Sequence, residues 1–393
     1  MLNRPYGPDV MGGTKERASL QLAFALYKYF PFGGLQRNML AMALEAIARG
    51  HGVTIYCSDW QGDCPMGIDL QVIPARGWDN AARMQNFAAD LRPKLKANDL
   101  LVGFNKWPGL DLYYAADSCF AYKAHYERGF FYRLAPRTKA YLTLEKAVFG
   151  AASKTQILEV SRPERERFVQ CYGTAEDRFN TLPPGIARNR VAPDNWQEIR
   201  SKTRDQLGLG SEQTCFLALG SGYKTKGLDR SIIALQTLCQ QGLDGVLLVV
   251  GEDKREPFVR QAEKLGLQER VRFLGGRDDV PNLLQAADLL LHPAYKENTG
   301  NALLEAMIAG LPVVASDVCG YAHYVRDGEM GAVIASPFNS DSYVAAIHQV
   351  LSVSGEQWHQ KGEDFAAKSD VYSRPQVAVD IMERLVDEKS VGQ

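Results

Sequence analysis

From about Thr214 onward, the sequence alternates short apolar runs with longer stretches of helical pattern. In the stretch after the first run, leucine and isoleucine residues recur at the spacing of one helix face. Repeated β–α–β units of this kind predict a parallel sheet with helices on both faces, which is a doubly wound α/β fold. The predicted strands are Thr214–Leu219, Val246–Val250, Val271–Leu274, Leu289–His292 and Leu311–Ser316, and the helical stripe comprises Leu228, Ile232, Leu235 and Leu238.

The first half of the chain follows the same scheme less regularly. Three apolar runs indicate strands, and a helix from Leu35 to Arg49 follows the turn of Gly33 and Gly34. At 393 residues the chain is long enough for two domains with full cores. We therefore predict two Rossmann-like doubly wound domains whose strand ends face a central cleft, where ligands of such folds bind. The three runs are Leu22–Leu26, Val53–Cys57 and Leu100–Phe104.

The expected domain boundaries follow from local composition. Leu182–Ile186, with two prolines and a glycine, punctuates the chain as an interdomain linker does. We expect residues 1–19 to be a flexible extension, residues 20–186 an N-terminal domain, residues 187–368 a C-terminal domain, and residues 369–393 a tail that packs back on the N-terminal domain.

The composition indicates a cytoplasmic protein. Lys15, Glu16 and Arg17 stand where a signal peptide needs its apolar stretch, and no apolar run is long enough to span a bilayer. Seven scattered cysteines without a Cys-x-x-Cys pair indicate reduced thiols rather than a disulfide or zinc framework. The formal net charge of −1 argues against a surface built to hold nucleic acid, although it permits a local basic patch.

The segment from His292 to Ala306 is the most informative for chemistry. Glu297 is expected in the loop at the carboxyl end of a buried strand, and Glu305 in the early turns of the next helix. Because Glu305 is the only charged residue between Gly300 and Gly310, we expect this helix to be buried nearly all round, with donors on its carboxylate. Vicinal ribose hydroxyls supply such donors, and the free N–H groups at the helix start favour anionic oxygens. The alternative is a solvated Glu297 and a Glu305 paired with Arg or Lys.

The Gly-rich turn Gly220–Gly227 is a second candidate. Its glycines let the backbone approach a ligand closely, and a lysine at the helix start can neutralise a departing pyrophosphate. The turn lacks the third glycine of the dinucleotide fingerprint, which disfavours a nicotinamide dehydrogenase. The alternative is an ordinary turn with a surface lysine. The turn of Gly33 and Gly34 is likewise either a contact for the diphosphate or acceptor, or only a tight turn.

Residues 122–149 mix basic and aromatic side chains. Six Lys or Arg residues stand against two Glu residues, and aromatic residues are interleaved with them. An anionic bilayer attracts such a segment with roughly 1 kcal/mol per Lys or Arg near the surface. We therefore predict peripheral membrane binding, and the alternatives are aromatics packed into the core or a patch for single-stranded nucleic acid. The candidate membrane residues are Lys123, Arg128, Phe130, Phe131, Arg133, Arg137 and Lys139.

Taken together, these segments resemble the retaining glycosyltransferases of family 4, which have the two-domain GT-B fold. Glu297 and Glu305 match that family's signature of two glutamates separated by seven residues. The resemblance covers about residues 21–372 and narrows to the lipopolysaccharide core glucosyltransferases that add the first hexose to the inner-core heptose. The runs similar to those enzymes are Leu26–Arg37, Gly103–Lys106, Leu182–Ile186 and Cys319–Tyr324.

The resemblance implies a metal-independent, peripheral enzyme at the cytoplasmic face of the inner membrane. It implies transfer of a hexose, with retention, from a UDP-sugar to a lipid-linked inner-core oligosaccharide, with Glu297 and Lys226 as catalytic residues. Glu297 would contact the hexose hydroxyls, Glu305 the ribose and Lys226 the diphosphate. The expected nucleotide-sugar contacts are Gly34, Arg190, Lys224, Lys226, Arg277, Asn298, Thr299, Gly300, Asn301 and Glu305, and the acceptor side comprises Gly33, Asn38, Asn105, Lys106 and Asp117.

Three departures from the family pattern leave the substrates open. Thr225 stands where an arginine commonly grips the diphosphate, and Asn38 replaces an acidic residue. Asn298-Thr299 replaces two small residues beside the sugar, so a galactose-type or N-acetylhexosamine donor is the alternative to glucose.

The mechanism and two rival functions also stay open. With no obvious nucleophile, we expect an oxocarbenium-like state with the leaving phosphate as base, and Asp117 is an alternative base. The rival functions are a UDP-sugar epimerase, which needs no lipid acceptor, and a non-catalytic membrane adaptor that binds sugar nucleotides.

Overall fold

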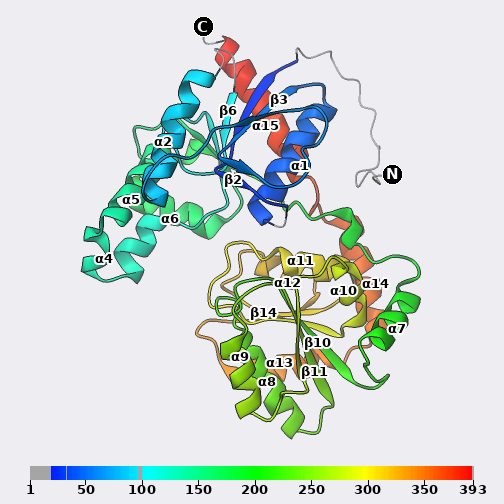
Figure 1. Ribbon diagram of the computed structural model, residues 1–393. Coiled ribbons are helices and arrows are strands. Elements are labelled where there is room, and N and C mark those ends of the chain that lie inside the picture. Colours follow the sequence, from blue (N-terminus) through cyan, green and yellow to red (C-terminus); the bar gives the residue numbers. More distant parts are fainter. Residues whose placement is uncertain (1–18, 32, 96–99, 392–393) are drawn as a thin grey trace. The chain divides into compact units, whose positions relative to one another are not determined.

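The computed structural model describes residues 19–31, 33–95 and 100–391 (Figure 1). The expected extension therefore lies outside the described residues, except for Ser19. The described chain forms two compact units. One contains the residues up to Gly185 together with those from Tyr372 on, and we call it the N-unit; the other, Ile186–Val371, we call the C-unit.

The N-unit is built on a seven-stranded sheet in the order β5-β3-β1-β6-β7-β8-β9, with every pairing parallel. The three predicted strands are confirmed as β1, β3 and β6. Four strands escaped prediction because they are three to five residues long and carry no clear run of β-branched residues. The strands are β1 Gln21–Ala25, β2 Lys28–Tyr29, β3 Gly52–Cys57, β4 Asp59–Trp60, β5 Ile68–Val72, β6 Leu100–Gly103, β7 Leu112–Ala115, β8 Gln156–Glu159 and β9 Phe179–Thr181, and β2 pairs only with β4.

Helices cover both faces of this sheet. On one face α1 lies beside α15, although the two come from opposite ends of the chain (Figure 1). Met39 and Met42 of α1 share one core with Ala378 and Met382 of α15. The second core contains side chains of α2, α5 and α6. The elements are α1 Gly34–Ala48, α2 Asn80–Leu91, η1 Arg92–Lys94, α3 Phe120–Tyr122, the π-helical turn η2 Lys123–Glu127, α4 Phe130–Leu134, α5 Pro136–Phe149, α6 Arg162–Tyr172, η3 Glu176–Arg178 and α15 Arg374–Val391.

The C-unit has a six-stranded parallel sheet in the order β12-β11-β10-β13-β14-β15. All five predicted strands are confirmed, and β15 was missed. The strand predicted from Leu311 begins at Val313, because the Leu311 N–H donates to the carbonyl of Ala306 and Pro312 has no N–H to donate. The strands are β10 Thr214–Leu219, β11 Gly245–Val250, β12 Val271–Gly275, β13 Leu289–His292, β14 Val313–Ser316 and β15 Gly331–Ile334.

The helices of the C-unit follow its strands, as the alternation predicts. The predicted apolar stripe of α8 is buried at all four positions. In the part of the chain that the structure describes, no helix is both long and apolar enough to cross a bilayer. The helices are η4 Arg188–Arg190, α7 Trp196–Gln206, α8 Leu228–Gln240, α9 Glu256–Lys264, α10 Val280–Ala286, α11 Asn301–Ile308, α12 Ala322–Asp327, α13 Ser340–Leu351 and α14 Gly355–Lys368.

Candidate functional site

Two loops meet at the carboxyl edge of the C-unit sheet, one after β10 and one after β13. The Tyr295 N–H donates to the carbonyl of Thr225 over 2.8 Å. A Cβ added to Gly227 would lie 2.0 Å from the carbonyl oxygen of Pro293, and the φ of Gly227 is +73°. Only glycine permits this approach. The two loops that the sequence singled out are therefore joined.

The contact between these loops places Lys226 on Glu297. The Lys226 ammonium forms an ion pair with the Glu297 carboxylate, whose side chain is 15% exposed. His292 Nε2, from the end of β13, lies 3.5 Å from the same carboxylate oxygen, Oε2. Burial raises the pKa of Glu297, but His292 and the charge of Lys226 outweigh burial and lower this pKa from 4.5 to about 2. The alternative of a solvated Glu297 is thus wrong.

A third loop, after β14, holds the backbone around Glu297. Glu297 forms a parallel bridge with Cys319, and the Tyr321 N–H donates to the carbonyl of Thr299 over 2.7 Å. A Cβ on Gly320 would lie 2.1 Å from the carbonyl oxygen of Asn298, so no side chain fits there. The run Cys319–Tyr324 was singled out only by its resemblance to the core glucosyltransferases, and in the structure it supports the backbone around Glu297.

Helix α11 begins beside this loop and carries Glu305. Gly300, with a φ of +101°, precedes the helix as its N-cap. The Glu305 side chain is 19% exposed and lies 3.8 Å from Arg190 Nε of η4. The helix is buried over most of its circumference, as predicted, and Asn301, Ala302 and Glu305 share its one partly open face at the helical period. The alternative reading of Glu305, a pairing with arginine, matches the structure.

Other predicted nucleotide-sugar residues differ in how closely they join this group. Asn298 and Thr299 lie in the loop between Glu297 and α11, partly buried, and Asn301 Oδ1 is buried without a hydrogen-bond partner among the described residues. Lys224 is exposed in the turn after β10. Arg277 pairs with Asp279 through two hydrogen bonds, 2.8 and 2.6 Å long. Arg277 is thus held by its own loop rather than by the glutamates.

In the N-unit, the predicted residues Gly33, Gly34 and Asn38 lie at the start of α1. A Cβ on Gly34 would meet nothing within 4 Å, whereas one on Gly33 would overlap the Gln36 side chain. Asn38 Nδ2 donates to the carbonyl of Gly34 over 2.8 Å, and Asn38 Oδ1 accepts from the buried guanidinium of Arg374 over 3.1 Å. Asn38 is thus engaged by its own helix and by α15.

The other predicted acceptor residues lie at the carboxyl edge of the N-unit sheet. Asn105 Oδ1 accepts from the N–H of Tyr27 over 2.8 Å and ties β6 to β1. Lys106 Nζ pairs with Glu145 over 2.5 Å, and although burial lowers the pKa of Lys106, the charges of Glu145 and Asp117 outweigh burial and raise it. Asp117 is exposed.

Glu145 is a structural residue that sequence reasoning missed. Its fully buried carboxylate accepts from Lys106, from the N–H groups of Phe120 and Ala121, and from the hydroxyl of Tyr172. The carboxylate of α5 therefore fixes the start of α3. A single glutamate in a helix of mixed polar and apolar residues gives no sequence signal of such a network.

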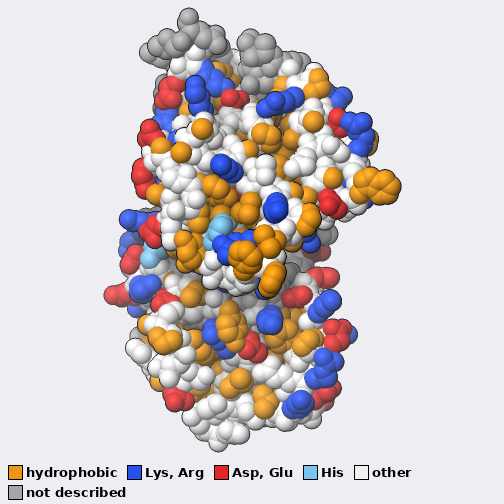
Figure 2. All heavy atoms as spheres, turned by 90° about the vertical axis from the view of Figure 1, so that its left-hand side faces the viewer, with side chains coloured by type: hydrophobic (Ala, Val, Ile, Leu, Met, Phe, Trp, Pro, Cys, Tyr) orange, Lys and Arg blue, Asp and Glu red, His pale blue; other side chains and the backbone are white. Residues whose placement is uncertain are grey.

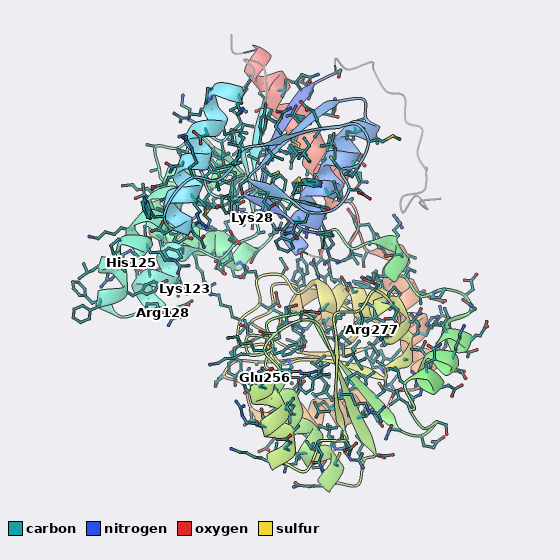
Figure 3. All side chains as sticks on the ribbon, in the orientation of Figure 1. Lys28, Lys123, His125, Arg128, Glu256 and Arg277 are labelled. Carbon is teal, nitrogen blue, oxygen red and sulfur yellow. The ribbon has the colours of Figure 1, made fainter. Side chains whose placement is uncertain are left out.

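The predicted membrane segment folds as α3, η2, α4 and α5, and part of it is strongly exposed. Phe130 is 61% and Phe131 85% exposed, whereas Phe149 is in the core. Arg128 and Arg133 lie over the rings of Tyr132 and Phe130, and Arg133 contacts His125. Figure 3 labels Lys123, His125 and Arg128 here, and Figure 2 shows hydrophobic, basic and histidine side chains together on the face that it presents. We call Lys123, Arg128, Phe130, Phe131, Arg133, Arg137 and Lys139 the insert surface.

This chain is similar to known glycosyltransferases in both sequence and fold. Residues 199–365 match the family model described as glycosyl transferases group 1. Over 366 residues the chain is 42% identical to the lipopolysaccharide glucosyltransferase WaaG of Escherichia coli (strain K12), covering 92% of this chain and 98% of that protein. The crystal structure of WaaG, a glycosyltransferase involved in lipopolysaccharide biosynthesis, matches with a TM-score of 0.85 at 42% identity, over 92% of this chain and 99% of that one. Anabaena Alr3699/HepE, solved in complex with UDP and glucose, shows the same fold with a TM-score of 0.70 at 19% identity, over 95% of this chain and 100% of that one.

Proposed function

Because this chain belongs to the group 1 glycosyl transferases and is a glycosyltransferase with the GT-B fold, we propose that it is a lipopolysaccharide core glucosyltransferase. The donor is UDP-glucose, and the acceptor is the inner-core heptose of a lipid-linked precursor. The N-unit binds the acceptor, and the C-unit binds the nucleotide sugar. The reaction takes place at the cytoplasmic face of the inner membrane.

One observation carries the donor assignment: two carboxylates and two cations flank the start of α11. Lys226 pairs with Glu297 on one side, and Arg190 pairs with Glu305 on the other. Carboxylates accept hydrogen bonds from vicinal hydroxyls, whereas ammonium groups and free helix N–H groups attract phosphate oxygens. We assign Glu297 to the hexose hydroxyls, Glu305 to the ribose and Lys226 to the diphosphate, with Arg190 beside Glu305.

The proposed reaction retains the anomeric configuration. The bond between the hexose and UDP breaks through an oxocarbenium-like state, and the acceptor hydroxyl attacks the face that UDP leaves. The departing phosphate takes the proton of that hydroxyl. Lys226 and the N–H groups at the start of α11 stabilise the charge that develops on the phosphate, so the protein itself supplies the cationic groups that the reaction needs.

The insert surface is the proposed membrane contact. Arg133 lies over the ring of exposed Phe130, and Arg128 and Arg137 lie over tyrosine rings. Such a combination of cations and aromatic rings suits an anionic bilayer surface. The acceptor is itself anchored in that bilayer, so docking there brings the N-unit to its substrate.

A transfer assay with a panel of donors tests the proposal. The purified full chain is given lipopolysaccharide precursor that ends in inner-core heptose, with UDP-glucose, UDP-galactose or UDP-N-acetylglucosamine. We expect glucose to be transferred with the highest kcat/KM, and the rate to survive excess EDTA. Preference for another UDP-sugar would correct the donor, and absence of transfer from every donor would overturn the assignment. Donor incubated alone must stay unchanged, because conversion of UDP-glucose to UDP-galactose would indicate an epimerase.

A further inference from the structure

His292 is a buried polar side chain at the end of a strand that is otherwise leucine. It closes β13 after Leu289, Leu290 and Leu291, and it is 1% exposed. Its Nε2 has no hydrogen-bond partner among the described residues, and it lies 3.5 Å from Glu297 Oε2, too far for a good hydrogen bond. A buried polar atom without a partner costs free energy that a leucine in the same place would avoid.

The reason for a histidine here is visible in what holds the Glu297 carboxylate. Oε2 contacts both the Lys226 ammonium and the His292 ring. In the proposed function a diphosphate binds beside Lys226 and carries more negative charge than one carboxylate, so the ammonium turns toward the phosphates when the donor binds. Glu297 then loses the stronger of its two partners at the moment when it must hold the hexose.

We propose that His292 is a positioning residue, which donates a hydrogen bond from Nε2 to Glu297 Oε2 in the donor-bound enzyme and so directs Oε1 to the hydroxyls of the donor hexose. The inference rests on the proposed function of this site. The ring is well suited to this task because His292 belongs to the buried strand β13, where it pairs with Ala315 of β14, rather than to either loop. Burial lowers the pKa of His292 and favours the neutral ring, and a neutral ring with its proton on Nε2 donates to Glu297 without adding charge to the sugar pocket.

The test compares two variants of His292 with a matched control. His292→Leu keeps the volume but removes the donor, and His292→Gln keeps an N–H donor near the position of Nε2. His359→Leu is the control, because His359 is also buried in the C-unit and its Nε2 lies 3.3 Å from Glu363. Each variant is measured for transfer with the UDP-hexose that the wild type prefers, for binding of that donor and of UDP alone, and for thermal stability.

We expect His292→Leu to lower kcat/KM about 10- to 100-fold, the usual cost of leaving a buried carboxylate without its partner. UDP, which has no hexose, should bind within about threefold of the wild type. The melting temperature should stay equal or rise, because the unpartnered Nε2 is gone, and His292→Gln should recover most of the rate. If His292 had a purely structural role, His292→Leu would instead lower the melting temperature and weaken the binding of UDP and of the donor equally. We expect this result for neither variant of His292, and at most for the control His359→Leu.

The results separate this inference from the proposed function. Wild-type enzyme that transfers no hexose at all would overturn the proposed function, whatever the variants do. Wild-type activity with His292→Leu equally active would overturn only the positioning role, as would a variant that loses UDP and donor binding to the same degree. Failure of His292→Gln to exceed His292→Leu in rate would exclude the Nε2 donor as the active feature.

Discussion

The edge of the C-unit and the insert surface of the N-unit use the same kinds of side chain in opposite ways. At the C-unit edge Lys226 and Arg190 are partly buried, and each is paired with a glutamate. On the insert surface Arg128 and Arg137 are exposed, lie over tyrosine rings, and form no ion pair among the described residues. Charge in the first region is balanced in place, whereas charge in the second faces outward.

This difference indicates what each region can bind. Paired, partly buried charges of both signs present acceptors and cationic donors at a defined place, so they suit a small ligand with both hydroxyl and phosphate groups. Exposed arginines that lie over aromatic rings and form no ion pair among the described residues suit a broad anionic surface of no defined geometry. Breaking one region should therefore leave the function of the other unchanged.

The largest effect is expected from Glu297→Gln. This change removes the charge of the carboxylate but keeps its size, and we expect kcat for transfer to fall about 10²- to 10³-fold, as when one preorganised group is removed from an active site. Binding of vesicles should not change. The measurement is steady-state transfer, with thermal stability recorded in parallel.

Asp244→Asn is the matched control for this variant. Asp244 pairs with Arg270 over 2.6 Å in the same unit, but both side chains are exposed. An exposed pair contributes little, so transfer should stay within about twofold of the wild type. Equal activity of Glu297→Gln and the wild type would remove Glu297 from the catalytic site.

The second effect concerns the insert surface. Replacing Arg128, Arg133 and Arg137 with alanine removes three charges that are each worth roughly 1 kcal/mol at an anionic bilayer, so binding to anionic vesicles should fall about 100-fold at low salt. Co-sedimentation with vesicles measures this. Transfer to a water-soluble acceptor should be unchanged.

Two further measurements distinguish a specific role of the insert surface from an effect of the protein's net charge. The triple change Arg76→Ala, Arg162→Ala and Arg384→Ala alters the net charge equally, but at exposed arginines outside the insert surface, and it should retain most of the binding. Wild-type pelleting that is equal with neutral and anionic vesicles, or that does not decrease with salt, contradicts the electrostatic contribution.

The sequence brings the two candidate glutamates together well because they lie in one contiguous stretch of the chain. One segment, His292–Ala306, contains the strand end, the loop and both glutamates, so the β–α–β pattern alone places them at one edge of the sheet. The residues that pair with these glutamates are harder to predict from the sequence. Lys226 and Glu297 are 71 positions apart, and the contact depends on Gly227 letting two loops touch. Periodicity identifies faces of elements but not which loops meet.

The insert surface shows the opposite limitation. Composition identifies the segment, but the mixture of α4, α5 and the π-helical turn η2 breaks any single period, so the sequence could not separate the buried Phe149 from the exposed Phe131. The Glu145 network is hidden for a related reason, because its donors come from the loop after β6, from α3 and from α6, and meet only in the folded unit. The four missed strands of the N-unit sheet carry no clear run of β-branched residues, so composition gives no signal for them.

The smallest effect tests whether the C-unit pairing also stabilises the fold, which the insert surface should not do. The pKa of Glu297 is lowered from 4.5 to about 2, so its contribution to the free energy of unfolding is complete above pH 4.5 and is lost as the pH falls from 4.5 toward 2. Wild type and Glu297→Gln should therefore differ most near neutral pH. By pH 3.5 the difference should have shrunk by about 1.4 kcal/mol, the value of one pKa unit.

Urea unfolding at pH 6.5 and 3.5 measures this difference in the free energy of unfolding. A constant difference would mean that Glu297 is not held in its charged form by Lys226 and His292. The same experiment on the variant that replaces Arg128, Arg133 and Arg137 should show no such change, because these three arginines form no ion pair with a carboxylate among the described residues.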